Sequence, residues 1–303
     1  MAIVVAVAAA VAAVEAVAAA GDAVAAGPDR FGFGWRAELA MGIFLHLDEI
    51  DIVEVIADDY FDATGKRAEV LRTLGQQVSV TLHGVGLGPA SAAPVDSQRL
   101  DRFARLIERV RPDSWSEHLA WVRAGGREIG HLAAPCRNLG TVEGTLRNIA
   151  TMRRVTGTAP VLENVATLID PPASPMTEAE WLTTVLREAD SGLLLDLHNV
   201  HANATNFGFD GVADFLRRIP LERVRTIHLA GGRMWRGRLL DDHLHDVPDP
   251  VFDLLEETAA RAPQPLTVLI ERDGRYEGVD SMLAQLRRAR RAVAAGRSRQ
   301  ASS

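Results

Sequence analysis

Eight short apolar runs recur along this chain, and each ends at or beside a polar residue that can bind a metal or a substrate. The clearest are TLHG (His83), SEHLAW (Glu117), VLENV (Glu163 and Asn164), LLLDLHNVH (Asp196), TIHLAGG (His228), LLDDHLH (Asp241 and His243) and VLIERD (Glu271). In a parallel barrel the carboxyl ends of all strands meet at one rim, so residues far apart in sequence share one site. The pattern therefore predicts an α/β fold, a (β/α)8 TIM barrel with one polar mouth.

Strands and helices are expected to alternate along the whole chain. The predicted strands cover 31–36, 51–57, 77–84, 113–121, 159–165, 192–199, 224–231 and 265–273. The predicted helices cover 37–47, 65–75, 97–110, 141–155, 177–189, 211–218, 249–262 and 279–294, and Thr177 with Glu180 suits a capping box. Runs such as GLLLDL lack period-two alternation, which is typical of strands buried on both faces. A doubly wound open sheet is the alternative, but no Gly-rich phosphate motif follows the first strand.

Three stretches divide the 303 residues. Residues 1–29 form an Ala/Val-rich extension, expected to be helical or disordered, residues 30–295 a single barrel domain, and residues 296–303 a polar tail. No Lys or Arg precedes Arg30, so the extension lacks the positive start of a signal peptide. Glu15 interrupts its apolar run too early for a membrane span.

Charge and cysteine content narrow the function classes. The net charge of −7 argues against a nucleic-acid partner, whose phosphates attract basic surfaces. Cys136 is the only cysteine, so no disulfide can form within the chain, and a cytoplasmic location is expected. No nucleophile elbow, P-loop or HExxH motif is present, so the chemistry is expected from metal or from carboxylates.

The polar residues at the predicted strand ends favour a metal cluster. Gathering their carboxylates without cations would be penalised by like-charge repulsion and desolvation. A ligand set of nitrogen and oxygen alone suits such a cluster better than a thiolate site. Asn199 is expected to support Asp196, while Arg36 and Arg272 flank the site. Arg272 could hold a substrate carboxylate, and an ion pair in the barrel wall is an equal alternative.

The ordered motifs HGVGLG, SEHLAW, LENV, LLLDLHNV, IHLAGG, a D-x-H segment and IERD resemble one known family. This is the multinuclear non-haem iron-dependent oxidative enzymes (MNIO), relatives of the methanobactin biosynthesis oxidase. The resemblance covers about 30–275 and implies a xylose-isomerase-like barrel holding two or three irons. It implies oxidation, with dioxygen as cosubstrate, of a residue of a ribosomally made precursor peptide, commonly a cysteine. A separate peptide-recognising partner protein often assists, and neither nucleic acid nor membrane is involved.

The resemblance also implies roles for individual residues. The implied metal ligands are His83, Glu117, Asn164, Asp196, His228, Asp241, His243 and Glu271. Asp241, His243 and Glu271 are the expected catalytic residues, and Arg36, Glu163, Asn199 and Arg272 are expected to bind substrate or support the ligands.

Three positions depart from the family pattern. Leu39 and Gly232 stand where the family often has histidine, and Asp58-Asp59 stands where it usually has Glu-Asn. Because leucine cannot bind metal, two irons are expected instead of three. Glu38 is the residue that could replace the missing ligand.

Two other functions compete with the oxidase. The first is a non-redox, divalent-metal sugar isomerase, epimerase or endonuclease on the same barrel. The second is a catalytically degraded barrel that serves as a peptide-binding scaffold. The departures from the family pattern at Leu39 and Gly232 favour this alternative.

Overall fold

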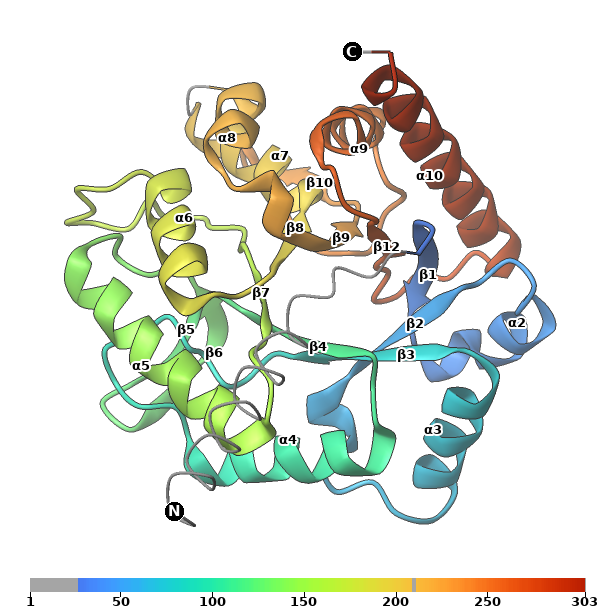
Figure 1. Ribbon diagram of the computed structural model, residues 1–303, viewed down its shortest axis with the longest axis horizontal. Coiled ribbons are helices and arrows are strands. Elements are labelled where there is room, and N and C mark those ends of the chain that lie inside the picture. Colours follow the sequence, from blue (N-terminus) through green and yellow to red (C-terminus); the bar gives the residue numbers. More distant parts are fainter. Residues whose placement is uncertain (1–26, 209–210, 303) are drawn as a thin grey trace, which may run out of the picture.

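The computed structural model describes residues 27–208 and 211–302, and its centre is a closed barrel of parallel strands (Figure 1). The barrel strands are β1 (Arg30–Gly34), β2 (Ile52–Ile56), β3 (Ser79–Gly84), β4 (Ser114–His118), β7 (Val161–Glu163), β8 (Leu193–Asp196), β9 (Val224–Leu229) and β12 (Thr267–Ile270). Their order around the barrel is β1-β12-β9-β8-β7-β4-β3-β2. The predicted (β/α)8 barrel is confirmed.

Helices surround the barrel (Figure 1). They are α2 (Ala40–Leu45), α3 (Gly65–Gln77), α4 (Ser97–Val110), α5 (Leu139–Thr156), α6 (Glu178–Ala189), α7 (Leu197–Phe207), α8 (Val212–Arg218), α9 (Asp249–Arg261) and α10 (Val279–Gln300), with 3-10 turns η1 (Ala37–Leu39), η2 (Ala57–Tyr60) and η3 (Leu221–Arg223). The predicted capping box of α6 is confirmed: Glu180 N donates to Thr177 Oγ1 at 3.2 Å, and Thr177 N donates to the Glu180 carboxylate at 2.8 Å.

Close packing between β1 and β2 explains a glycine in the first strand. A Cβ at Gly32 would lie 1.7 Å from the carbonyl oxygen of Ile52, so any side chain would push the two strands apart. The neighbouring Phe33 and Val53 are fully buried, as expected for strands covered on both faces.

Helix α7 follows β8 without a connecting loop, which the sequence did not predict. The stretch 192–199 was expected to be one strand, but the strand ends at Asp196 and the helix begins at Leu197. The Asp196 carboxylate accepts a hydrogen bond from Asn199 N at 2.7 Å and thereby caps the helix. This cap places a residue of the polar mouth at a fixed strand-to-helix junction.

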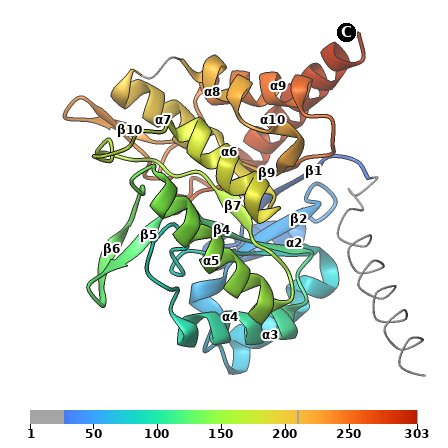
Figure 2. The same ribbon diagram turned by 60° about the vertical axis from the view of Figure 1, so that its left-hand side comes forward.

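Two β-hairpins, also not predicted, fill the long connections after β4 and β9. One consists of β5 (Trp121–Ala124) and β6 (Arg127–Ala133), and the other of β10 (Arg233–Trp235) and β11 (Arg238–Leu240). Gly125 and Gly126 both have positive φ, which the tight turn between β5 and β6 requires. Figure 2 shows both hairpins projecting from the same side of the molecule.

The last helix is tied to the amino end of the barrel. Helix α10 continues to Gln300, although 279–294 was predicted as helix and 296–303 as a polar tail. It is held there because Arg297 bonds both carboxylate oxygens of Asp29, at 3.1 and 2.8 Å, and the carbonyl oxygen of Gln264 at 2.7 Å. Asp29, assigned to the extension, also accepts from Leu266 N and so belongs to the barrel.

Residues 1–26, which make up most of the predicted extension, lie outside the described residues. Among the residues that the structure does describe, no helix combines the length and apolar character that crossing a bilayer requires.

Candidate metal centre

The register of the barrel strands brings the predicted polar residues to one rim. His118 at the end of β4 lies opposite Glu163 at the end of β7, and Asp196 at the end of β8 lies opposite His228 on β9. Glu271 follows β12 directly, and its backbone N–H donates to the carbonyl oxygen of Leu229 at the end of β9. Side chains from separate strands therefore meet at the carboxyl end of the barrel, as that fold requires of a shared site.

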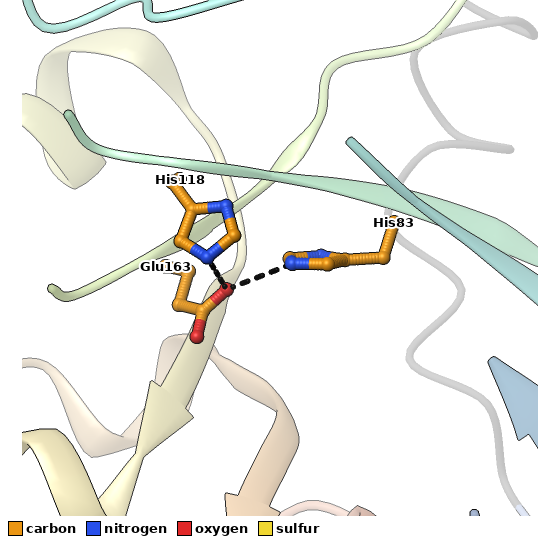
Figure 3. A group of neighbouring side chains, drawn as sticks. All are labelled: His83, His118 and Glu163. Atoms are coloured by element: carbon orange, nitrogen blue, oxygen red, sulfur yellow. Dashed lines mark ion pairs between the residues drawn. The ribbon is translucent and has the colours of Figure 1, made fainter. Parts of the chain in front are cut away.

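The first candidate ion-binding group joins β3, β4 and β7 (Figure 3). The Nε2 atoms of His83 and His118 each lie 3.3 Å from the same carboxylate oxygen of Glu163. All three side chains are buried or nearly so. Two imidazole nitrogens and one carboxylate oxygen at this spacing form three of the ligands that a divalent ion needs.

Two further groups continue the row. Glu163, Asp196 and His228 form the second, and Asp196, His243 and Glu271 form the third, with all ligand atoms of a group within 4.8 Å of one another. In the second, His228 Nδ1 is 3.5 Å from Glu163 Oε1, and in the third, His243 Nδ1 is 3.5 Å from Glu271 Oε2. Because Glu163 and Asp196 each belong to two groups, the three groups form one connected row.

Three imidazoles of this row have one ring nitrogen close to a neighbouring group, while the second ring nitrogen faces the site. His83 Nδ1 lies 2.7 Å from the Ser116 hydroxyl, and His118 Nδ1 donates to the carbonyl oxygen of Gly84 at 3.1 Å. The anchor leaves Nε2 of each ring directed at the site. Such partners fix the orientation of a metal-binding histidine and its ligating nitrogen.

Glu54 anchors the third ring and was missed by the sequence analysis. It lies in the middle of β2, only 2% exposed, and its Oε1 is 3.0 Å from His228 Nε2. The other nitrogen of His228 therefore faces Glu163 and Glu271. The available signal was a glutamate inside the otherwise apolar run IVEVIA.

His118 takes the place in the row that the sequence analysis gave to Glu117. Side chains alternate along a strand, so these neighbours point to opposite faces. The Glu117 carboxylate accepts hydrogen bonds from Leu87 N at 3.2 Å and His118 N at 3.0 Å, and it belongs to none of the three groups. It holds the loop after β3 in place. Burial, Asp58 and Glu163 raise the pKa of Glu117 well above its ordinary value, despite these hydrogen bonds.

Asn164, another implied ligand, connects β7 to β8. Its Nδ2 donates to the carbonyl oxygen of Asp196 at 3.0 Å, and its Oδ1 accepts from Asp196 N at 2.9 Å. Asn199 Nδ2 in turn donates to the carbonyl oxygen of Asn164 at 3.1 Å. The two amides thus position Asp196. Glu163, expected only to support the ligands, is instead shared by two groups.

The loop after β11 contributes Asp241 and His243. Asp241 Oδ1 lies 2.8 Å from His243 Nε2 and 3.7 Å from Nε2 of the buried His198. His243 Nδ1 lies 3.3 Å from Asp273, which accepts a hydrogen bond from Arg36. His243 has a φ of 50°, uncommon for a residue with a side chain, and Asp273 N donates to its carbonyl oxygen. This loop is therefore held in a constrained shape at the site.

The remaining sequence expectations fall outside the row. Arg272 points away from Glu271 and pairs with Asp246, as in the ion-pair alternative. Leu39 is buried in the hydrophobic core, and Glu38 is exposed on η1. A Cβ at Gly232 would lie 1.9 Å from the carbonyl oxygen of Leu240 and 2.6 Å from His198 Nε2. With this backbone, a histidine at position 232 would not fit beside His198.

Charged groups in the row strongly shift one another's pKa values. Burial disfavours the charge of Glu163, but His118, His228 and His83 outweigh it and lower the pKa of Glu163 to about 2. Burial together with Asp241 and Glu163 raises the pKa of Asp196 well above its ordinary value. The pKa values of the two shared carboxyl groups are therefore shifted in opposite directions, as expected where carboxylates crowd together.

A cavity of about 380 Å³ opens onto the row. Its polar lining includes His118, Glu163, Asp241 and His243. Its apolar lining includes Leu132 from β6, Leu168 from the loop after β7, and Leu239 and Leu240 from β11. Both hairpins and the loop after β7 therefore contribute to the walls of the cavity.

Comparison with known proteins gives one family match. A family model described as "RiPP precursor modification enzyme MbnB/TglH/ChrH" matches residues 30–294, where RiPP denotes a ribosomally synthesised and post-translationally modified peptide. A UPF0276 protein of Bordetella parapertussis is 34% identical, over 89% of this chain and 94% of the relative. A UPF0276 protein of Rhizorhabdus wittichii is 35% identical, over 86% and 93%.

Solved structures share the fold at low identity. L-ribulose 3-epimerase has a TM-score of 0.59 and 12% identity, over 90% of this chain and 97% of that one. A xylose isomerase domain protein from Alicyclobacillus acidocaldarius has a TM-score of 0.55 and 17% identity, over 88% and 99%. Endonuclease IV from Thermus thermophilus has a TM-score of 0.54 and 16% identity, over 88% and 99%. These likenesses show a xylose-isomerase-like TIM barrel and nothing about the reaction.

Proposed function

Because the chain belongs to the family of RiPP precursor modification enzymes MbnB/TglH/ChrH, we propose that it oxidises a residue, in the first place a cysteine, of a ribosomally made peptide with iron and dioxygen. The observation that carries the proposal is the connected row of three His/Asp/Glu groups at the floor of the mouth. The family supplies the peptide substrate, and the row supplies the place for the metal.

The residues of the row fit bound cations. His83 Nε2, Glu163 Oε2 and Asp196 Oδ2 are buried and make no hydrogen bond with any residue in the described part of the chain. Leaving buried polar atoms unpaired costs about 1–3 kcal/mol each, and coordination to a cation removes that cost. Bound iron would supply the redox chemistry that dioxygen requires and that amino-acid side chains lack.

The geometry supports three ion positions as well as two. The expectation of two irons rested on Leu39, yet none of the three groups needs a ligand from position 39. Glu163 and Asp196 would each be shared between neighbouring ions. We therefore take three as the upper number for this row.

Protein groups around the row would handle protons and hold the substrate. Asp241 and His243 both line the cavity, so a carboxylate and an imidazole that can exchange protons with a substrate lie within its reach. Arg36 and Asp273 keep the imidazole in place from its other side. The hairpin walls would exclude water around a bound peptide residue.

Oxygen consumption by iron-loaded protein tests this proposal. Protein purified without oxygen and loaded with Fe(II) should consume dioxygen when mixed with the cysteine-containing precursor peptide encoded next to its gene. His118→Ala removes a ligand of the first group and should lower both iron content and oxygen consumption. Glu117→Gln, one residue away and outside the row, is the matched control and should retain its iron.

Two results would contradict the proposal. Full activity with Zn, Mg or Mn under nitrogen would indicate a non-redox metal enzyme. Less than one ion per chain after loading would indicate a peptide-binding scaffold instead of an enzyme.

A further inference from the structure

The hairpin β10–β11, residues 233–240, carries an unusual combination of side chains and is called the basic hairpin below. Its sequence RMWRGRLL places three arginines within six residues of a chain whose net charge is −7. Met234 and Trp235 are 60% and 49% exposed. Exposed apolar side chains next to arginine are typical of surfaces that bind another molecule, where Trp and Arg contribute most of the energy.

The three arginines have different partners. Arg238 donates to the carbonyl oxygen of Asn206 at 2.6 Å and so fastens the hairpin to α7. Arg233 lies 3.3 Å from Asp242 but is half exposed. Arg236 lies over the ring of Trp235 at 4.4 Å and forms no ion pair with a residue in the ranges the structure describes. At least one guanidinium, stacked on an exposed indole, is thus available to an anion.

The position of the basic hairpin connects it to the mouth. Leu239 and Leu240 at its base line the same cavity as His118 and Glu163. The chain continues from Leu240 directly into Asp241 and then His243. Figure 2 shows the hairpin projecting from the same side of the molecule as the loop that follows β7, whose Leu168 lines the same cavity. A molecule held on the hairpin therefore lies next to the entrance of the site.

We propose that the basic hairpin binds an acidic and apolar segment of the peptide that the enzyme modifies. Carboxylates of the peptide pair with Arg236 and with the exposed part of Arg233, while an apolar side chain packs on Met234 and Trp235. This inference rests on the proposed function and adds to it the chemical character of the substrate next to the modified residue.

Two synthetic peptides test the inference without knowledge of the natural substrate. The first is a fluorescent twelve-residue peptide of alternating Glu and Leu with one central cysteine, and the second has Lys in place of every Glu. Binding is measured by fluorescence anisotropy at low salt, without iron or oxygen. We expect the acidic peptide to bind at least about 10-fold more tightly, and the difference to shrink as salt rises.

Matched variants locate the binding surface. Arg236→Glu should weaken binding of the acidic peptide about 10-fold or more, and Trp235→Ala about 5-fold or more. Arg291→Glu makes the same charge change on an exposed position of α10, and Met41→Ala removes a side chain that is 73% exposed on α2. Neither control should change binding. Circular dichroism and the melting temperature of each variant confirm that it is folded.

Several outcomes would overturn the inference. Equal binding of both peptides, equal losses in Arg236→Glu and Arg291→Glu, or tighter binding of a twelve-nucleotide single-stranded DNA would each do so. A dimer in wild-type protein that dissociates in Trp235→Ala would assign the hairpin to a second copy of the chain. Since iron and oxygen are absent here, these results are independent of the oxygen-consumption test, whose failure counts against the proposed function.

Discussion

The charged and polar groups at the two ends of the barrel are satisfied in opposite ways. At the amino end, every nitrogen of the Arg297 guanidinium is used, by Asp29 and by the carbonyl oxygens of Ala259, Ala262 and Gln264. At the carboxyl end, buried atoms of Glu163 and others in the row make no hydrogen bond with any of the described residues. One end holds a completed ion pair, and the other holds buried polar atoms without a hydrogen-bond partner among the described residues. The first arrangement stabilises the fold and the second serves function, at a cost in stability.

The largest expected effect comes from breaking the carboxyl-end row at a shared residue. Glu163→Gln removes a carboxylate that belongs to two groups, so we expect metal loss from both and a fall in activity of at least about 100-fold. This is the upper end of the loss of about 10- to 100-fold that is typical of residues that only support a ligand. The free energy of unfolding of the metal-free protein should change by no more than about 1–2 kcal/mol. Metal analysis and urea denaturation measure the two effects. A large loss of stability with retained metal would mean that the row is structural.

Breaking the ion pair at the amino end should have the reverse effect, a loss of stability without a loss of metal. Arg297→Ala leaves Asp29 without its partner, and we expect the free energy of unfolding to fall by about 2–3 kcal/mol, less than for a fully buried pair because the site is partly exposed. Metal content and activity per folded molecule should stay at wild-type values. Urea denaturation followed by circular dichroism checks the first point. If Arg297→Ala instead lost metal while remaining stable, the division between the two ends would be wrong.

A half-buried carboxyl group outside both ends, that of Glu178, gives a smaller and pH-dependent effect. Burial raises the pKa of Glu178, at the start of α6, to about 7, although Arg137 and Asn203 oppose the shift. The folded protein therefore binds a proton that the unfolded chain has released, so stability falls as pH rises from about 4.5 to about 7. Each pKa unit corresponds to about 1.4 kcal/mol, and access of solvent from a neighbouring cavity reduces the total to about 1–2 kcal/mol.

Glu178→Gln tests this effect because glutamine keeps the shape and cannot ionise. The variant should match wild type near pH 4.5 and exceed it above pH 7.5, as measured by urea denaturation at both values. A difference between the two proteins that does not vary with pH would show that Glu178 has an ordinary pKa.

The sequence predicted the barrel because each strand is a short apolar run that ends in polar residues. It identified most members of the row for the same reason: the carboxyl ends of parallel strands converge. The sequence analysis chose the wrong member of the row where two adjacent polar residues compete for one position. Glu117 and His118 are both polar and adjacent, and only the pleat of β4 determines which one faces the barrel interior.

Other features depend on contacts that a linear pattern does not contain. Glu54 lies in mid-strand and is recognisable as part of the site only once His228, on a strand across the barrel, is placed beside it. Helix α7 is rich in Asn and His, which favour helices weakly, yet it forms because Asp196 caps it and Asn203 ties it to the carbonyl oxygen of Val165. In α7, the local cap and the tertiary contact of Asn203 together offset the weak helix preference of its residues.

The pairing of β1 with β12 has a consequence for how the chain folds. Arg30 lies beside Thr267, 237 residues later, so the first strand's neighbour on that side is the last strand to be synthesised. Until then, the edge of β1 is unpaired and open to association with other chains. Barrel closure is consequently a late step with a high contact order, and a ribosome that stalls before β12 would leave an aggregation-prone, open sheet.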